Sequence, residues 1–253
     1  MRYFFGFVLI LLATLSAPFS YAAETIVLKR GLPTDIWLTW PTDERLDEPG
    51  LIAKFPEYRQ EYQGQEFHMA KKAGFDFIRL TIDPAIFLYN RTPEKTAKLI
   101  AGMKIAIAEI QAAGLNVVVD MHSIPRVGTS PGTFQVMENA ALFKTYLAVI
   151  ADIGKSLAGY DAMQVAFEPM NEPTADCEWD MKSGDKPKWP AMLKQLHGAA
   201  RAAAPKLTLI LSGGCWESDR WAVGVVRQCL QLDESDHRPQ HVDPGGGAGH
   251  RHR

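Results

Sequence analysis

Hydrophobic positions along the chain fall into short apolar runs separated by longer segments with helical periodicity. The short runs are bounded by turn residues and predict β-strands, whereas the longer segments predict amphipathic helices. Strands are expected at residues 75–80, 115–121, 163–167 and 207–211, with an earlier strand at 25–28 or at 36–38. The run at 115–121 is apolar at almost every position, which is typical of a parallel strand buried on both faces.

The helical segments lie between these strands, and their ends carry recognisable signals. Thr92 and Pro93 are the expected N-cap and first residue of one helix, and Gly114 is expected to end it in a left-handed conformation. Further helices are expected at 65–73, 137–157 and 190–204. The alternation indicates parallel βαβ units and an α/β fold, and periodicity alone leaves open a doubly wound sheet or a (β/α) barrel.

Chemically capable side chains follow the predicted strands at one end. Arg79 lies near the end of the second strand, His122 follows the third, and Asn171 and Glu172 follow the fourth. Because the carboxyl ends of parallel strands meet at one face, this pattern favours a barrel enzyme, whose active site is built there. No Gly-rich phosphate loop follows the first strand and no G-x-x-x-x-G-K-[ST] motif occurs, which argues against a nucleotide-binding sheet.

Composition and charge narrow the class of partner. Of the 253 residues, 47% are hydrophobic and 22% are charged, which is typical of a globular protein and excludes a wholly disordered chain. Lys+Arg 27 against Asp+Glu 29 gives a net charge of −2, so we expect neither a nucleic acid nor an anionic membrane as partner. The three cysteines lack the paired spacing of a zinc site, and we expect no metal and no cofactor.

The N-terminus has the pattern of a secretory signal peptide at residues 1–22. Arg2 precedes an apolar run at 3–13, and small residues near Ala22 provide a cleavage point before Ala23. An uncleaved anchor is the alternative, but the run is shorter than the roughly 20 residues that a membrane span needs. We therefore expect a secreted or periplasmic protein with no membrane association after cleavage.

Three segments in order along the chain resemble glycoside hydrolase family 5, the cellulase-like (β/α)8 barrels. Residues 167–173, Phe-Glu-Pro-Met-Asn-Glu-Pro, look like the Asn-Glu-Pro signature of that family. Residues 118–122 resemble its third-strand pattern and residues 74–80 its second-strand pattern. The resemblance spans roughly residues 24–216 and implies hydrolysis of a β-linked polysaccharide, with cellulose-type β-1,4-glucan ahead of mannan.

The resemblance also implies roles for individual residues. Glu172 would be the general acid/base of a retaining two-carboxylate mechanism, Asn171 would bind the sugar 2-hydroxyl, and Arg79 and His122 would line the subsite at the cleaved bond. Each role has a structural alternative, because Glu172 could cap a helix, Arg79 could form a strand-end ion pair and His122 could be a core histidine. For Glu168 we favour a structural role, because it precedes the strand end.

Two tryptophans and two cysteines add further candidates near the strand ends. Trp40 and Trp216 lie near the ends of strands one and five, where they could stack on sugar rings or simply pack. Cys177 and Cys215 follow adjacent strands, which makes them a candidate disulfide without settling the pairing.

Only about five of the eight βα units of such a barrel can be recognised. In the family the nucleophile is a glutamate at the end of strand seven, and no counterpart of it is evident here. We therefore expect a partial barrel domain at 23–216 and a disordered tail at 217–253, which lacks Phe, Tyr and Ile and holds four of the seven histidines. A frameshift near codon 216 is one hypothesis and a short native form another. The alternative function is an inactive barrel fragment that at most binds sugar.

Overall fold

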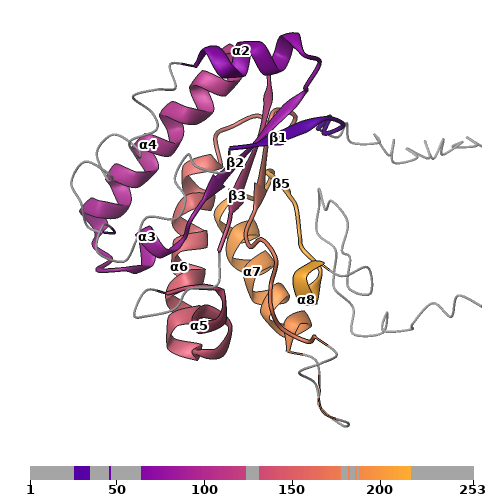
Figure 1. Cartoon of the computed structure of the whole chain (residues 1–253). Coiled ribbons are helices and arrows are strands. Elements are labelled where there is room, and N and C mark those ends of the chain that lie inside the picture. The colour runs from indigo at the N-terminus through magenta and orange to yellow at the C-terminus, as the bar shows by residue number, and fades with distance from the viewer. Residues whose placement is uncertain are drawn as a thin grey trace, which may run out of the picture.

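The computed structural model describes residues 26–34, 46, 64–123, 131–177, 182, 186 and 188–217. Within this part of the chain, five parallel strands form one sheet in the order β1-β2-β3-β4-β5. Each strand thus pairs with the next strand along the sequence. A doubly wound sheet reverses its strand order at a switch point, whereas a (β/α) barrel does not. The described residues therefore form five strands of a (β/α)8 barrel, the expected fold (Figure 1).

The elements alternate along the chain. The strands are β1 (Gly31–Pro33), β2 (Phe77–Ile82), β3 (Asn116–Met121), β4 (Val165–Glu168) and β5 (Thr208–Leu209). The helices are α2 (Gln65–Lys72), α3 (Ala85–Leu88), α4 (Pro93–Ala112), α5 (Thr133–Glu138), α6 (Ala140–Leu157), α7 (Trp189–Ala203) and α8 (Gly214–Glu217). The second to fifth predicted strands are confirmed, with bounds that differ by at most two residues at either end.

Of the two alternatives for the first strand, the one at 25–28 is wrong and the one at 36–38 is untested. Residues 26–28 are irregular, residues 36–38 lie outside the described part, and β1 occupies Gly31–Pro33 instead. Gly31 pairs with Phe77 of β2, and a Cβ atom on Gly31 would lie 2.1 Å from the Phe77 ring. A side chain at position 31 would therefore force the Phe77 ring to move, and a search for hydrophobic runs passes over the glycine that stands there.

Local capping sets the helix bounds. The side chain of Thr92 accepts a hydrogen bond from the Lys95 amide at 3.1 Å, and Gly114 follows α4 with φ 77°, which confirms both predicted ends. The helix expected at 137–157 is in fact two helices, α5 and α6. Asn139 leaves the helical conformation between them, and its Oδ1 accepts from the amides of Ala141 and Leu142 at 3.0 Å. Asparagine is a strong N-cap, so a new helix begins there.

The two faces of the sheet carry different side chains because successive residues of a strand point to opposite sides. The face that packs against α4, α6 and α7 is apolar, and these helices lie along the sheet in Figure 1. Its strand residues, all at most 2% exposed, are Ile78, Leu80, Ile82, Val117, Val119, Met121, Val165, Phe167 and Leu209. This layer is the main hydrophobic core.

The opposite face changes character along the strands. A small apolar cluster of Ile26, Val118 and Ala166 occupies its middle. One step toward the carboxyl ends, the register neighbours Thr81, Asp120 and Glu168 are polar and at most 4% exposed. A row of buried polar groups across three adjacent strands needs hydrogen-bond partners, and the partners define the site below.

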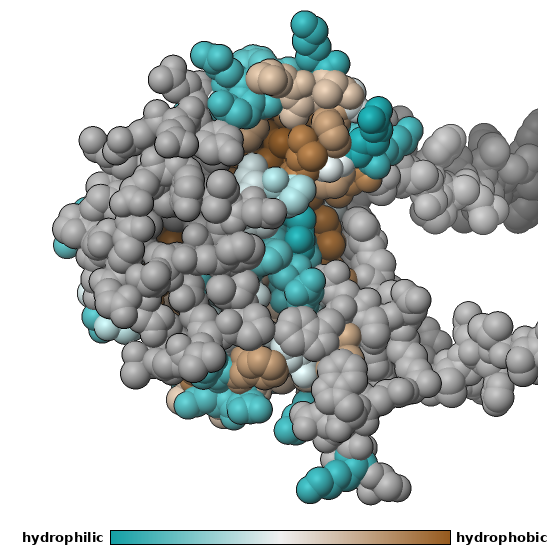
Figure 2. Space-filling view, in the orientation of Figure 1, coloured by the Kyte–Doolittle hydropathy of each residue, from teal (hydrophilic) through white to brown (hydrophobic). Residues whose placement is uncertain are grey.

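The described surface is mixed. Its exposed large hydrophobic side chains are Val27, Leu32, Met69, Ile105 and Phe134. Figure 2 shows one face, on which hydrophobic residues are bordered by hydrophilic ones. Among the described helices, none combines the length and the apolar character that crossing a membrane requires.

Candidate active site

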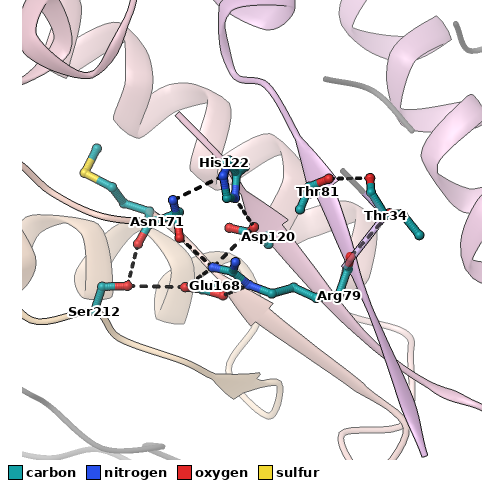
Figure 3. Close-up of polar contacts among 9 residues, drawn as sticks. Thr34, Arg79, Thr81, Asp120, His122, Glu168, Asn171 and Ser212 are labelled. Carbon is teal, nitrogen blue, oxygen red and sulfur yellow. Dashed lines mark hydrogen bonds and ion pairs between the residues drawn. The ribbon is translucent and has the colours of Figure 1, made fainter. Parts of the chain in front are cut away.

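Arg79 of β2 is the centre of the polar cluster at the carboxyl ends of the strands (Figure 3). Its Nε donates to Glu168 Oε2 at 2.9 Å and its Nη2 donates to Glu168 Oε1 at 2.8 Å, so the pair is bidentate. The same Nη2 lies 3.3 Å from Asp120 Oδ2. Both carboxylates are buried, whereas the Arg79 side chain is 25% exposed. One guanidinium therefore compensates two buried negative charges, an arrangement that tolerates the loss of no member.

Asn171 lies directly against this cluster. Its side-chain Oδ1 accepts from Arg79 Nη2 at 2.7 Å, and its Nδ2 lies 3.4 Å from His122 Nε2. Its backbone amide donates to the carbonyl of Met121 at 3.1 Å, which ties the loop after β4 to the end of β3. Because Arg79 can only donate, it fixes which end of the Asn171 amide is the oxygen. The Nδ2 group is thereby presented on the His122 side.

His122 follows β3 and is oriented by Asp120. The distance from His122 Nδ1 to Asp120 Oδ2 is 2.7 Å, so in the neutral ring Nδ1 carries the proton and Nε2 faces the Asn171 amide as an acceptor. Burial is the largest influence and lowers the pKa of His122, but the hydrogen bond and the charge of Asp120 outweigh it, so the pKa is raised overall. Arg79 acts against this rise, and the charge of Glu172 adds to it.

Glu172 is exposed, between the buried residues Asn171 and Pro173. Its backbone φ is 42°, in the left-handed region that residues other than glycine rarely occupy. Such a conformation persists where the surrounding structure determines it, and it occurs often at functional sites. The exposed carboxylate beside an otherwise buried cluster is therefore the group most accessible to a substrate.

The loop after β4 is held further along by a disulfide. Cys177 is bonded to Cys215 of α8, with 4.7 Å between the Cα atoms, which confirms the candidate pair. Beside it, the amide of Cys215 donates to the carbonyl of Ala175 at 2.8 Å. The carboxylate of Asp176 accepts from the amides of Lys188 and Trp189 at the start of α7 at 2.8 and 2.7 Å. The segment that carries Glu172 is thus connected to both α7 and α8.

The structure brings four of the six sequence-predicted site residues together. His122, Asn171 and Glu172 follow the carboxyl ends of β3 and β4. Arg79 lies in the middle of β2 rather than near its end, and its side chain reaches Asn171. Trp40 lies outside the described residues. Trp216 belongs to α8, and its side chain is outside what the structure describes.

Sequence reasoning missed the part that Asp120 plays. The signal for it was present, because Asp120 is a carboxylate inside an otherwise apolar strand and must find a partner there. Glu168 is engaged by Arg79 on both of its oxygens. Within the described ranges, no group of three or more His, Cys, Asp or Glu residues could hold a metal ion.

Comparison with known structures identifies the same barrel. The structure of Thermotoga maritima Cel5A in complex with mannotriose substrate is 20% identical, with a TM-score of 0.55, over 76% of this chain and 53% of that chain. The cellulose synthase subunit Z (CcsZ) from Clostridioides difficile is 18% identical, with a TM-score of 0.54, over 77% and 56%. The chain therefore spans about half the length of these structures.

A third structure, the endo-beta-mannanase/endo-beta-glucanase PbGH26A-GH5A from Prevotella bryantii, is 16% identical, with a TM-score of 0.51, over 74% of this chain and 28% of that chain. No curated protein sequence matches the chain. The family model for cellulase (glycosyl hydrolase family 5) matches residues 50–241, which includes part of the segment that we expected to be a separate tail. Since this match covers most of the sequence, the chain belongs to glycosyl hydrolase family 5.

Proposed function

We propose that this chain is a glycosidase that cleaves a β-linked polysaccharide by a retaining mechanism, with Glu172 as general acid/base. One observation carries the proposal: Glu172 is presented at the end of β4, beside a buried network of Arg79, Asp120, Glu168 and Asn171. The network is rigid because most of its members have two or more polar contacts. A fixed environment around an exposed carboxylate suits proton transfer to a bound substrate.

The proposed chemistry assigns a step to each accessible group. Glu172 protonates the leaving oxygen as the glycosidic bond breaks, and then takes a proton from the water that attacks the glycosyl intermediate. Asn171 uses a hydrogen of its Nδ2 group to hold the sugar 2-hydroxyl, while its Oδ1 stays on Arg79. His122 lines the same subsite and is kept in one tautomer by Asp120.

A retaining mechanism also needs a second carboxylate about 5–5.5 Å from the first. Asp120 and Glu168 are buried and ion-paired with Arg79, so we assign neither of them as nucleophile. The nucleophile is not assigned among the described residues.

The substrate class follows from chemistry and from the named relatives. Solved structures of Cel5A from Thermotoga maritima contain cellobiose or mannotriose, and PbGH26A-GH5A is described as both an endo-beta-mannanase and an endo-beta-glucanase. We propose β-1,4-glucan or β-mannan for this chain. Export to the periplasm or the exterior is part of the proposal, supported by the signal-like residues 1–22 and by the disulfide, which persists in oxidising compartments.

A second candidate function is sugar binding without turnover. It is favoured by the lack of an assigned nucleophile in the described part of the chain, where five strands of a barrel are present. Such a protein would bind an oligosaccharide along the Arg79 to Asn171 face and release it unchanged.

One experiment separates the two functions. Release of reducing ends from soluble β-1,4-glucan and from β-mannan is measured for the wild type, for Glu172→Gln and for Glu138→Gln, an exposed carboxylate on α5 that serves as control. Calorimetry with a cello-oligosaccharide measures binding in parallel. Turnover that only Glu172→Gln abolishes supports the hydrolase, whereas binding without turnover supports the second function. Neither turnover nor binding would contradict both.

A further inference from the structure

Three hydrogen bonds hold the backbone immediately before Glu172. Tyr146 of α6 donates from its hydroxyl to the carbonyl of Pro169 at 2.7 Å. Ser212, which follows β5, donates from its hydroxyl to the carbonyl of Met170 at 2.7 Å. The amide of Asn171, which is the other end of the Met170 peptide group, donates to the carbonyl of Met121 at the end of β3. Two consecutive peptide groups are thus held by partners from three different parts of the fold.

The hydroxyl of Tyr146 is a polar group within the apolar core. Its side chain is fully buried among the apolar residues between the sheet and the helices, a place that phenylalanine would fill equally well. A hydroxyl buried there destabilises the fold unless it is bonded, and the bond it makes is to the site loop. Burial raises the pKa of Tyr146 well above its usual value, with the charges of Asp120, Asp83 and Glu168 adding to the rise, so the hydroxyl remains a donor.

Ser212 contacts the same loop, and Figure 3 shows its side chain beside Glu168. It is 6% exposed, and its Oγ lies 2.7 Å from the Met170 carbonyl and 3.3 Å from Glu168 Oε1. A hydroxyl has one hydrogen, which the shorter contact takes. The backbone of Ser212 is itself fixed, because its carbonyl accepts from the indole of Trp189 at 3.1 Å.

We propose that Tyr146 and Ser212 are positioning residues that together hold Glu172 in its left-handed backbone conformation. The φ of 42° at Glu172 is unfavourable for a side chain with a Cβ, so peptide groups that were free to rotate would relax it toward φ below zero. Relaxation would turn the carboxylate away from Asn171 and His122. The structural part of this inference stands alone, and its catalytic consequence rests on the proposed hydrolase function.

The structural part is tested by amide hydrogen exchange at Asn171 in Tyr146→Phe, Ser212→Ala and the double variant of the full chain. The matched control is Thr208→Val, which removes a buried hydroxyl whose bond to the Ala162 carbonyl, at 2.9 Å, lies at the other end of the sheet. Each single variant should exchange about tenfold faster at Asn171, and the double variant faster still, since a lost hydrogen bond to a buried carbonyl is worth about that factor. Thr208→Val should leave this exchange rate unchanged.

The catalytic part is tested by steady-state kinetics on soluble β-1,4-glucan. Tyr146→Phe and Ser212→Ala should each lower kcat about tenfold with KM changed less than twofold, because the proton-transfer geometry is lost while the sugar-binding face remains. Ser212→Thr keeps the hydroxyl and should retain most of the wild-type kcat. A merely structural role would not lower kcat while leaving KM nearly unchanged.

The outcomes are distinct. Unchanged exchange at Asn171 in both single variants would overturn the inference, as would an equal effect of Thr208→Val. If the wild type shows no turnover, the proposed function fails, and the exchange measurement still decides whether Tyr146 and Ser212 hold the loop. Because the two residues lie on different elements, a folding defect in one variant leaves the other to decide.

Discussion

The two faces of the sheet differ in what they can tolerate. On the face toward α4, α6 and α7, the buried residues are apolar, and each contributes through the area that it removes from water. On the opposite face, at the carboxyl ends, Asp120 and Glu168 are buried around one guanidinium. Interactions in the apolar layer are non-directional, so small changes of side-chain volume there lower the free energy of unfolding only moderately. The polar cluster depends on specific partners, so a single loss leaves an uncompensated charge.

This difference separates stability from chemistry within one fold. The helices and the apolar face provide the support, and the opposite face holds the groups that we propose act on a substrate. Variants on the two faces should therefore differ in the pH dependence of their stability, because only the polar face contains titratable groups in direct contact with one another.

The largest effect is expected from Arg79→Met. Removal of the guanidinium leaves two buried carboxylates without their cation and should lower the free energy of unfolding by about 3–5 kcal/mol at neutral pH. Lowering the pH protonates these carboxylates and should recover part of the loss. Urea denaturation at pH 7 and pH 5 measures both values. Arg91→Met is the control, because the pair of Arg91 with Asp152 is partly exposed and should be worth at most about 1 kcal/mol.

A somewhat smaller effect is expected from Ile107→Ala on the apolar side. Ile107 of α4 is fully buried in the main core, so the cavity left by this change should lower the free energy of unfolding by about 3 kcal/mol. The loss should be the same at pH 7 and pH 5, since no titratable group loses a partner. A loss that depends on pH as strongly as that of Arg79→Met would break the distinction between the two faces.

Thr92→Ala should have a smaller effect that is also independent of pH. The side chain of Thr92 caps the first turn of α4, and losing such a cap lowers stability by about 1 kcal/mol. Thr92→Ser keeps the hydroxyl and should be close to the wild type in the same denaturation measurement. Equal losses in both variants would show that the cap contributes nothing.

The smallest effect is expected from the titration of His122. Because its pKa is raised in the folded protein, its contribution to stability is fully present below the unfolded pKa of about 6.5 and is lost as pH rises through the folded pKa. Burial lowers the pKa of His197, so His197 affects the pH dependence of stability in the opposite direction. The difference in the free energy of unfolding between wild type and His122→Gln, measured as a function of pH, isolates the contribution of His122. An NMR titration that gives His122 a pKa at or below 6.5 would contradict the expectation.

Hydrophobic patterning was sufficient to predict β2 to β5 and the helix ends marked by Thr92 and Gly114. These features are local, because they depend on periodicity and on caps within a few residues. The break at Asn139 was also a local signal, and it was overlooked because the apolar pattern continues across it. Hydrophobic patterning could not place β1, because this strand depends on the pairing of Gly31 with Phe77, 46 positions away in the chain.

In the candidate site, too, local features could be predicted from the sequence and long-range contacts could not. Arg79, His122, Asn171 and Glu172 follow from their places at the predicted strand ends. The pairing of Arg79 with Glu168 and Asp120 depends on the register between three strands, which no sequence window contains. In the sequence, Tyr146 looks like any other aromatic residue of an amphipathic helix. Only the hydrogen bond from its hydroxyl to the Pro169 carbonyl distinguishes its role from that of the surrounding core residues.

The proposed role of Glu172 as acid/base is tested most directly by how the cleavage rate depends on the leaving group. Kinetics of Glu172→Ala are compared with the wild type on soluble β-1,4-glucan and on a dinitrophenyl cellobioside, whose phenolate leaves without being protonated. If Glu172 is the acid/base, its removal should slow glycosidic cleavage of the glucan about 10²–10⁴-fold and cause little loss in the first step on the activated substrate. An equal loss on both substrates, or no loss on the glucan, would contradict this role.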